Sequence, residues 1–209
     1  MVRNFLNALT NNRWASVQGV AFSAALRSLG IPVGVGLSCR QFPRLQRDPS
    51  SQILIGNNVE FKGEVDLRVR EGSSLVISDD VRLDSGVRIV VANGARVILE
   101  PGVDIGILTI MNCGADVNVG RDTLIAGMCL VQTGQHGMRK SARIRGQAHI
   151  QDPIVIGADC WVGSQSTIVG GVSLGLGAVV GANSVVNSDI PQYAIAVGSP
   201  ARVKSYRHD

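Results

Sequence analysis

The feature that most constrains this chain is an aliphatic residue at every sixth position over residues 156–186. These positions hold Ile156, Val162, Ile168, Leu174, Val180 and Val186. A period of six fits neither a helix nor a strand, whose side chains repeat at 3.6 and 2 residues. It predicts a solenoid whose units bury their apolar faces only by stacking on one another. Each coil would have three short strands and three corners, with one inward aliphatic residue on each side.

Small residues accompany the aliphatic residue at every sixth position, a repeat that is here called the six-residue beat. Glycine follows four of the aliphatic residues, and a small residue or cysteine usually stands four positions after each. We expect these glycines to supply corner conformations that a Cβ atom would penalise. The pattern resembles the hexapeptide-repeat acyltransferases, and this resemblance implies an all-β fold, a left-handed parallel β-helix of triangular cross-section. That hand is the exception to the usual right-handed crossover. A Gly- and Val-rich parallel β structure without chemistry is the alternative.

The beat extends towards the N-terminus in coils of 22 residues. Ile55, Ile77 and Leu99 begin successive coils, so each coil has four residues more than three hexapeptides. The extra residues fall around 71–73, 93–95 and 113–115, where Gly and polar residues predict one wider corner that stacks from coil to coil. We therefore expect a β-helix over residues 51–187, closed by a C-terminal segment over residues 188–209.

Residues 1–50 lack the beat and form a separate segment. Apolar residues at helical spacing, followed by Gly30-Ile31-Pro32 as a stop signal, predict one or two amphipathic helices and then a linker. A helix that caps the open end of the solenoid is one interpretation. The other is peripheral membrane contact through residues 1–30, with Arg3, Arg13 and Arg27 around the apolar stripe.

Composition narrows the functional classes. The chain has 209 residues, of which only 4% are aromatic, and a formal charge of +4. Without a long basic run or interleaved aromatic residues, nucleic acid is not an expected partner, whereas an anionic ligand is. The four widely spaced cysteines predict reduced structural thiols. We recognise no signal peptide and no spanning segment, so we expect a cytoplasmic protein.

The beat is interrupted over residues 132–153, and loops of this length in a compact domain are usually functional. His136 stands at the first edge of the interruption, whereas His149 lies near its far end, among residues with no repeat register. The segment is also basic, which predicts either a solvated charge run or an electropositive wall beside an acceptor or phosphates. Its basic residues are Arg139, Lys140, Arg143 and Arg145.

The segment TGQHGMR, followed after the loop by PIVIGADCWVG, resembles the maltose and galactoside acetyltransferases and the related polysaccharide and nodulation-factor O-acetyltransferases. The resemblance implies that His136 is the catalytic base, and we expect His149 and His208 to be incidental. Imidazole titrates near neutrality and can take the proton of a sugar hydroxyl as that oxygen attacks a thioester. The histidines are too dispersed in the sequence to predict a metal site. The chain lacks a G-x-S-x-G motif, so a serine hydrolase is not favoured.

The closing segment DIPQYAIAVGSPAR resembles the end of the same family, in which acetyl-CoA lies along the last coils. Matched position by position, the resemblance implicates Ser164, Ala182, Asn187 and Arg202 in binding acetyl-CoA. The family often has a basic residue where this chain has Ser205, so Lys204 or Arg207 would substitute. The acceptor-side Asn of the sugar acetyltransferases should lie near residues 105–108, where this chain has none.

These observations predict an acetyl-CoA-dependent O-acetyltransferase that acts on a hydroxyl of a sugar, polysaccharide or glycolipid. The resemblance also implies a homotrimer with active sites between subunits. Two alternatives stay open: N-acetylation of an amino sugar or nucleotide-amino sugar, and a β-helix scaffold without catalysis. A carbonic-anhydrase-like metal enzyme is less favoured, because it needs three histidine ligands contributed across a trimer.

Overall fold

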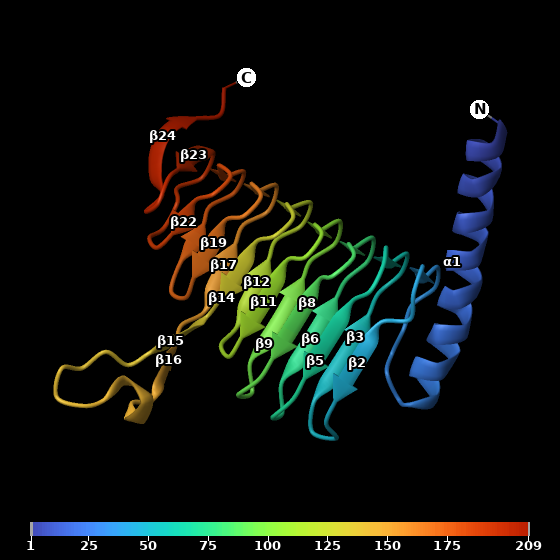
Figure 1. Ribbon diagram of the computed structural model, residues 1–209, viewed down its shortest axis with the longest axis horizontal. Coiled ribbons are helices and arrows are strands. Elements are labelled where there is room, and N and C mark those ends of the chain that lie inside the picture. Colours follow the sequence, from blue (N-terminus) through green and yellow to red (C-terminus); the bar gives the residue numbers. More distant parts are fainter. Residues whose placement is uncertain (1, 209) are drawn as a thin grey trace.

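The computed structural model describes residues 2–208, and the side chains of residues 14–208. It is a parallel β-helix, and the one α-helix among these described residues, α1 (Val2–Ser28), lies across one end (Figure 1). The predicted all-β parallel solenoid is therefore confirmed. One helix forms where the sequence allowed one or two.

Three sheets form the walls of the prism, and the chain visits them in turn. Their strands pair in parallel, except that β24 at the end of the second wall pairs antiparallel with β23. The first wall contains β3 (Gln52–Ile55), β6 (Ser74–Ile77), β9 (Arg96–Leu99), β12 (Val117–Val119), β17 (Ile154–Ile156) and β20 (Ser173–Leu174). The second wall contains β1 (Ser38–Cys39), β4 (Glu60–Phe61), β7 (Arg82–Leu83), β10 (Asp104–Ile105), β13 (Leu124–Ile125), β18 (Trp161–Val162), β21 (Val179–Val180), β23 (Ala194–Val197) and β24 (Arg202–Tyr206). The third wall contains β2 (Arg44–Arg47), β5 (Asp66–Val69), β8 (Arg88–Val91), β11 (Ile110–Cys113), β14 (Leu130–Gln132), β19 (Thr167–Val169) and β22 (Val185–Val186).

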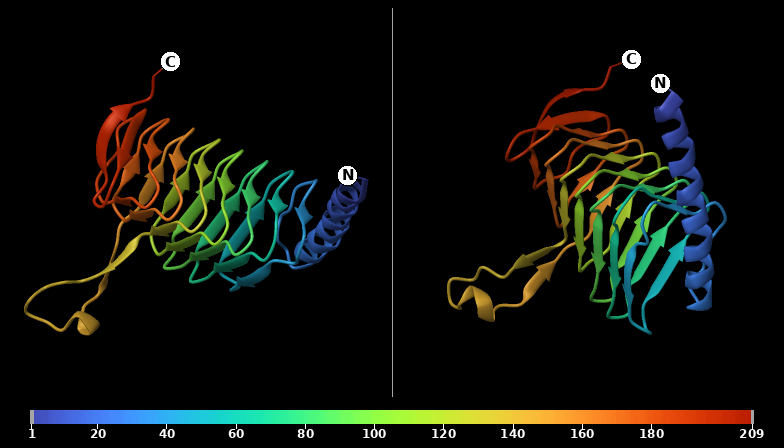
Figure 2. Two further views of the ribbon diagram at one scale, coloured as in Figure 1. Left: turned by 45° about the horizontal axis from the view of Figure 1, so that its top comes forward. Right: turned by 45° about the vertical axis from the view of Figure 1, so that its right-hand side comes forward.

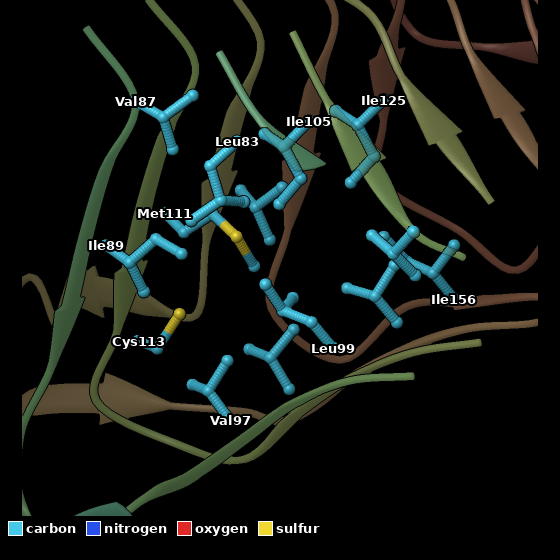
Figure 3. Packing of buried hydrophobic residues seen from close by; sticks show 14 of the residues in the cluster. Leu83, Val87, Ile89, Val97, Leu99, Ile105, Met111, Cys113, Ile125 and Ile156 are labelled. Carbon is cyan, nitrogen blue, oxygen red and sulfur yellow. The ribbon is translucent and has the colours of Figure 1, made fainter. Parts of the chain in front are cut away.

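The interior is a column of aliphatic side chains contributed by all three walls. All six residues of the beat between Ile156 and Val186 are buried, as predicted. Figure 3 shows the same arrangement further along the prism, where Leu83, Ile89 and Leu99 point into one shared core. A narrow interior of this kind takes Val, Ile and Leu in layers, which explains the scarcity of aromatic residues.

The glycines of the beat have a different role from the one that the sequence suggests. Gly157, Gly163, Gly175 and Gly181 do not have positive φ; within these hexapeptides the left-handed conformation falls two residues later, at Asp159, Gln165, Gly177 and Asn183. A Cβ atom at Gly163 would lie 2.6 Å from the backbone nitrogen of Ala182 in the next coil. These glycines are therefore required by the close approach of stacked backbones.

The corner between the third and first walls, here called the third corner, is the wide corner that the 22-residue spacing predicts. Glu71 and Asn93 have left-handed backbones there, with φ of 61° each. The Asn93 amide donates to Glu71 Oε2 at 3.0 Å, and the Gly94 amide donates to the Glu71 carbonyl oxygen at 2.9 Å. These bonds tie one wide corner to the next, so the corner stacks from coil to coil.

Helix α1 packs on the first coil. Ala15 and Leu26 are buried, and a Cβ atom at Gly19 would overlap with the carbonyl oxygen of Leu37. The helix therefore crosses directly over the backbone at the start of the prism. Among the residues that the structure describes, no helix has the length and hydropathy needed to cross a lipid bilayer.

The four cysteines are free and buried, as predicted. Desolvation raises the pKa of each thiol, and it raises the pKa of Cys113 to about 12. All four therefore stay protonated at neutral pH and serve as small core side chains.

The core packing yields a test of the fold. Val180 is fully buried, so Val180→Asp would bury a carboxylate without a partner, and we expect it to abolish folding. Val180→Ala is the matched control, and it should lower the free energy of unfolding by about 2 kcal/mol. Urea unfolding followed by circular dichroism measures both. A soluble Val180→Asp variant that unfolds cooperatively would contradict the inward position of the side chain.

Candidate functional site

The interruption over residues 132–153 is an arm that leaves the prism at the third corner. The chain departs after β14 in the third wall and returns at β17 in the first wall. Figures 1 and 2 show the arm extending away from the coils. The arm is more ordered than the sequence suggests, since β15 (Gly134–His136) and β16 (His149–Gln151) form an antiparallel hairpin, and the segment between them contains a 3-10 turn at Ile144–Gly146.

The hairpin brings two histidines together. His136 is the cross-strand partner of His149, and the centroids of their rings lie 4.2 Å apart at an angle of 53°. Both side chains are exposed. His149 lies outside the repeat register, as expected, but the register of the hairpin fixes it opposite His136. His208, by contrast, follows β24 near the C-terminus and is exposed.

A polar groove of about 320 Å³ runs along the third corner at the base of the arm. Its floor includes outward-facing residues in one register column of the third wall, namely Val90, Asn112 and Gln132. His149 and Gln151 line its side from the arm, whereas His136 does not line it. The histidine pair therefore meets the groove through His149.

Thr133 anchors the arm to the wide corner. Its buried Oγ1 accepts hydrogen bonds from the backbone amides of Gly114 at 2.8 Å and Ala115 at 3.2 Å. The same hydroxyl bonds to Gln151 Oε1 at 3.0 Å. Both strands of the hairpin are thus tied to the coil beneath them, so the histidines have a fixed base.

The tip of the arm is organised by one amide side chain. Gln147 Oε1 accepts from the backbone amide of Arg139 at 2.8 Å, and Gln147 Nε2 donates to the carbonyl oxygens of Arg139 and Ala142 at 3.0 Å each. The basic residues of the arm are all exposed. The arm therefore displays its positive charge on a defined turn.

The residues that the resemblance implicates in binding acetyl-CoA lie elsewhere on the prism. Ser164 and Ala182 occupy the second corner, between the second and third walls, one coil apart, and the Asn183 amide donates to the Ser164 carbonyl oxygen at 2.9 Å. Asn187 follows β22 and is exposed, and Arg202 and Lys204 are exposed on β24. Ser164 and Ala182 thus belong to the second corner and Arg202 and Lys204 to the last strand, whereas Asn187 lies at the third corner, between β22 and Ile190, which pairs with the first wall.

Arg207, the alternative basic residue at this end, is already engaged. Its Nη1 forms an ion pair with Asp159 Oδ2 at 2.8 Å and donates to the Gly177 carbonyl oxygen at 3.2 Å. Both partners belong to the first corner, between the first and second walls. Arg202 begins β24 and Arg207 directly follows it, so the two residues lie at opposite ends of this strand. Since β24 runs antiparallel to β23, Arg202 lies towards the second corner and Arg207 towards the first. Lys204 is therefore the better companion for Arg202.

His136 and the predicted acetyl-CoA residues are not brought together within one chain. His136 stands on an arm at the third corner, whereas Ser164 and Ala182 lie at the second corner. The third wall separates the two corners. Of the residues predicted to bind acetyl-CoA, Asn187 shares the third corner with the arm, whereas Ser164 and Ala182 lie on a different edge of the prism from His136.

Some exposed residues near these positions were not predicted from the sequence. Trp161 is 52% exposed and belongs to β18, the strand that directly precedes Ser164. Its side chain points outward from the second wall, beside that of Leu124 on the neighbouring strand. Asn112 lies in the groove although residues 105–108 contain no Asn, and Ile107 and Leu108 are exposed instead. A strand-by-strand register would have found both, since Trp161 precedes a beat residue and Asn112 follows one.

Known proteins match parts of this chain. A family model described as the hexapeptide repeat of succinyl-transferase matches residues 153–188. The putative lipopolysaccharide biosynthesis O-acetyl transferase WbbJ of Escherichia coli is 36% identical over 102 residues, which cover 44% of this chain and 52% of that protein. The galactoside O-acetyltransferase of Escherichia coli is 37% identical over 87 residues, which cover 42% of each protein. The probable acetyltransferase Rv3034c of Mycobacterium tuberculosis is 35% identical over 99 residues, 47% of this chain and 33% of that protein. The chain thus spans between a third and about half of the length of these relatives.

Solved structures share the fold over most of the chain. AntD, an N-acyltransferase from Bacillus cereus solved with dTDP-4-amino-4,6-dideoxyglucose and coenzyme A, matches with a TM-score of 0.58 and 18% identity, covering 90% of this chain and 89% of that one. The polysialic acid specific acetyltransferase NeuO matches with a TM-score of 0.51 and 22% identity, covering 86% and 89%. At these identities the likeness shows the fold alone. The comparisons thus show a hexapeptide repeat over residues 153–188, similarity to named acetyltransferases over part of the chain, and a shared fold over most of it.

Proposed function

We propose that this chain is an acetyl-CoA-dependent O-acetyltransferase that acts on a hydroxyl of a sugar, polysaccharide or glycolipid. The observation that carries the proposal is the His136–His149 pair, which a tethered hairpin holds beside a polar groove. Relatives named for O-acetyl transfer to galactosides and in lipopolysaccharide biosynthesis support the same reaction.

His136 is the proposed general base. It accepts the proton of the acceptor hydroxyl as that oxygen bonds to the thioester carbonyl carbon. The carbon–sulfur bond then breaks, and the imidazolium returns its proton to the departing thiolate. The products are an acetyl ester and free CoA, so one histidine serves both proton transfers and no acyl-enzyme is needed. His149 lines the groove and contacts the ring of His136, so its role in this scheme is to orient that ring.

Acetyl-CoA is proposed to bind along the last coils, beside Ser164 and Ala182 at the second corner and beside Asn187 at the other end of the short strand β22. The second corner suits an extended arm, because Ser164 and Ala182 are stacked one coil apart. Arg202 and Lys204 would meet the CoA phosphates with charge-assisted hydrogen bonds. In this scheme residues 1–50 close one end of the prism, residues 51–187 carry the chemistry, and residues 188–209 hold the phosphates.

A homotrimer with threefold symmetry would complete the site. The arm of one prism extends away from its own coils, and its proposed base cannot meet the second corner across the third wall of the same chain. In a closed trimer each subunit offers an identical arm to its neighbour. Each active site would then combine the histidine pair of one subunit with the second corner of another.

The proposed working place is the cytoplasm, where acetyl-CoA is formed and consumed. Acceptors would be glycans or glycolipid precursors at the inner face of the membrane.

N-acyl transfer to an amino sugar is the second candidate. It stays a candidate because AntD, which shares the fold over 90% of this chain, is named as an N-acyltransferase. Hydroxylamine distinguishes the two products, because it cleaves an O-acetyl ester and leaves an acetamide intact.

Replacement of the proposed base tests the mechanism. His136→Ala should lower turnover by about 10²–10⁴-fold, the usual contribution of a general base, while acetyl-CoA still binds. His149→Ala should lose less, and His208→Ala is a control that should behave as wild type. Free-thiol release across a panel of sugars, nucleotide-sugars and glycans measures turnover. Near wild-type turnover in His136→Ala with full loss in His149→Ala would reverse the assignment.

Arg202→Ala tests the proposed phosphate contact. The variant should raise the KM for acetyl-CoA more than it lowers kcat, because a charge-assisted bond to a remote phosphate contributes mainly to binding. Arg207→Ala is the matched control, since its guanidinium is paired with Asp159 at the other end of β24. An Arg202→Ala variant with an unchanged KM, whose preference for acetyl-CoA over its dephospho form matches that of wild type, would refute the assignment.

Shared active sites can be tested by mixing two inactive variants. His136→Ala lacks the base, and Ala182→Trp would block the second corner, so neither should turn over alone. Refolded together at equal concentrations, they should regain about a quarter of wild-type activity if each site combines two subunits at random. Light scattering should give the mass of a trimer. No recovery in mixed trimers, or a stable and active monomer, would contradict the shared site.

A further inference from the structure

The end of the prism covered by α1 has an unpartnered apolar face. Ala15 and Leu26 of the helix pack inward, and the opposite side presents Trp14, Val17 and Val20, which are 65%, 58% and 71% exposed. At 100° per residue, Ala21 and Ala24 fall on this outward side as well. Over residues 14–26, the outward side of the helix therefore contains no charged residue.

This face continues onto the first coil. Val35 and Phe42 are largely exposed, and the ring of Phe42 lies 5.8 Å from that of Phe22 on the helix. A shallow groove of about 280 Å³ joins the two elements, with Val20 on one side and Val35 on the other. Helix and coil thus form one surface, here called the end face: Trp14, Val17, Val20, Val35 and Phe42.

The segment that contains the end face is basic. Residues 1–47 contain six Arg and no acidic residue, whereas the rest of the chain contains 14 basic and 16 acidic residues. In the described part of this segment, none of the arginines forms an ion pair with a carboxylate. Two of them are fixed by backbone oxygens instead: Arg27 Nη2 donates to the carbonyl oxygens of Val33 and Gly34, and Arg47 Nη2 donates to that of Leu29.

We propose that the end face docks on the surface of an anionic lipid bilayer. Valine and phenylalanine side chains would enter the boundary between head groups and acyl chains, and Trp14 would lie at the level of the head groups, where indole rings concentrate. The unpaired arginines would meet lipid phosphates. The bilayer is favoured over a second copy of this chain, because two end faces in contact would oppose their arginines without any carboxylate between them.

Co-sedimentation of the full chain with vesicles tests the proposal. Vesicles with about 30% phosphatidylglycerol in phosphatidylcholine should pellet the protein at low salt, and binding should fall at least tenfold at high salt or with phosphatidylcholine alone. Equal binding to both kinds of vesicle, or none to either, would overturn it. In a Trp161→Phe variant, in which Trp14 is the single tryptophan, emission should shift to shorter wavelength on binding. An unshifted emission would contradict insertion of the end face.

Variants locate the surface. The double variant Val17→Glu/Val20→Glu should bind anionic vesicles at least tenfold more weakly, and Arg40→Gln/Arg44→Gln should weaken binding and its salt dependence. Met138→Glu/Ile144→Glu is the matched control, since it adds the same two charges at exposed apolar sites on the arm and should bind as wild type. Urea midpoints equal to wild type would show that the variants fold. Wild-type binding by the Val17/Val20 variant, or a change in the mass of the assembly caused by it, would overturn the proposal.

Discussion

The stacking of one coil on the next is the interaction on which the rest of this structure depends. Each strand bonds to the strand one coil away, and corner amides continue the ladder, as in the bonds from Gly163 to the Val180 carbonyl oxygen at 2.7 Å and from Gly181 to that of Ala196 at 2.9 Å. Such ladders satisfy the backbone only if every coil has the same shape. The aliphatic beat follows from this requirement, because an identical shape presents the same inward positions in every turn. A residue such as Val180 is therefore fixed by its neighbours above and below rather than by its own strand.

A stack of this kind tolerates insertions at its corners. Val117 pairs with Val97 twenty residues earlier and with Ile154 thirty-seven residues later, yet both pairs belong to one continuous sheet. The arm therefore adds residues without disturbing the walls, since the chain leaves and re-enters in register. Chemistry can be attached to a corner while the core stays unchanged, which agrees with the general separation of site from scaffold. Thr133 illustrates the connection, because its hydroxyl ties the arm to the corner that it leaves.

The sequence predicts the repetitive part of this molecule better than the rest. The six-residue beat is sufficient for the walls, the buried positions and the wide corner at Glu71 and Asn93, because repetition makes each local signal count several times. The arm occurs once and carries no alternation of apolar and polar residues, so nothing in it reveals that His149 lies opposite His136. The ion pair of Arg207 with Asp159 is equally hidden, since it depends on β24 turning back along β23. The roles of the glycines were misjudged because close backbone approach is a property of stacked coils and not of one hexapeptide.

The triangular section also determines how function can be distributed. Three walls give three separate edges, so the proposed base at the third corner and the proposed acetyl-CoA position at the second corner of the same chain face different directions. A catalytic group and its co-substrate can then meet only if another chain contributes one of them, or if the arm folds back over the third wall. The second route would break the tether at Thr133, whose hydroxyl contacts the amides of Gly114 and Ala115 and the side chain of Gln151. The architecture thus favours assembly over rearrangement, and it leaves the end covered by α1 free for a role that does not compete with the chemistry at the edges.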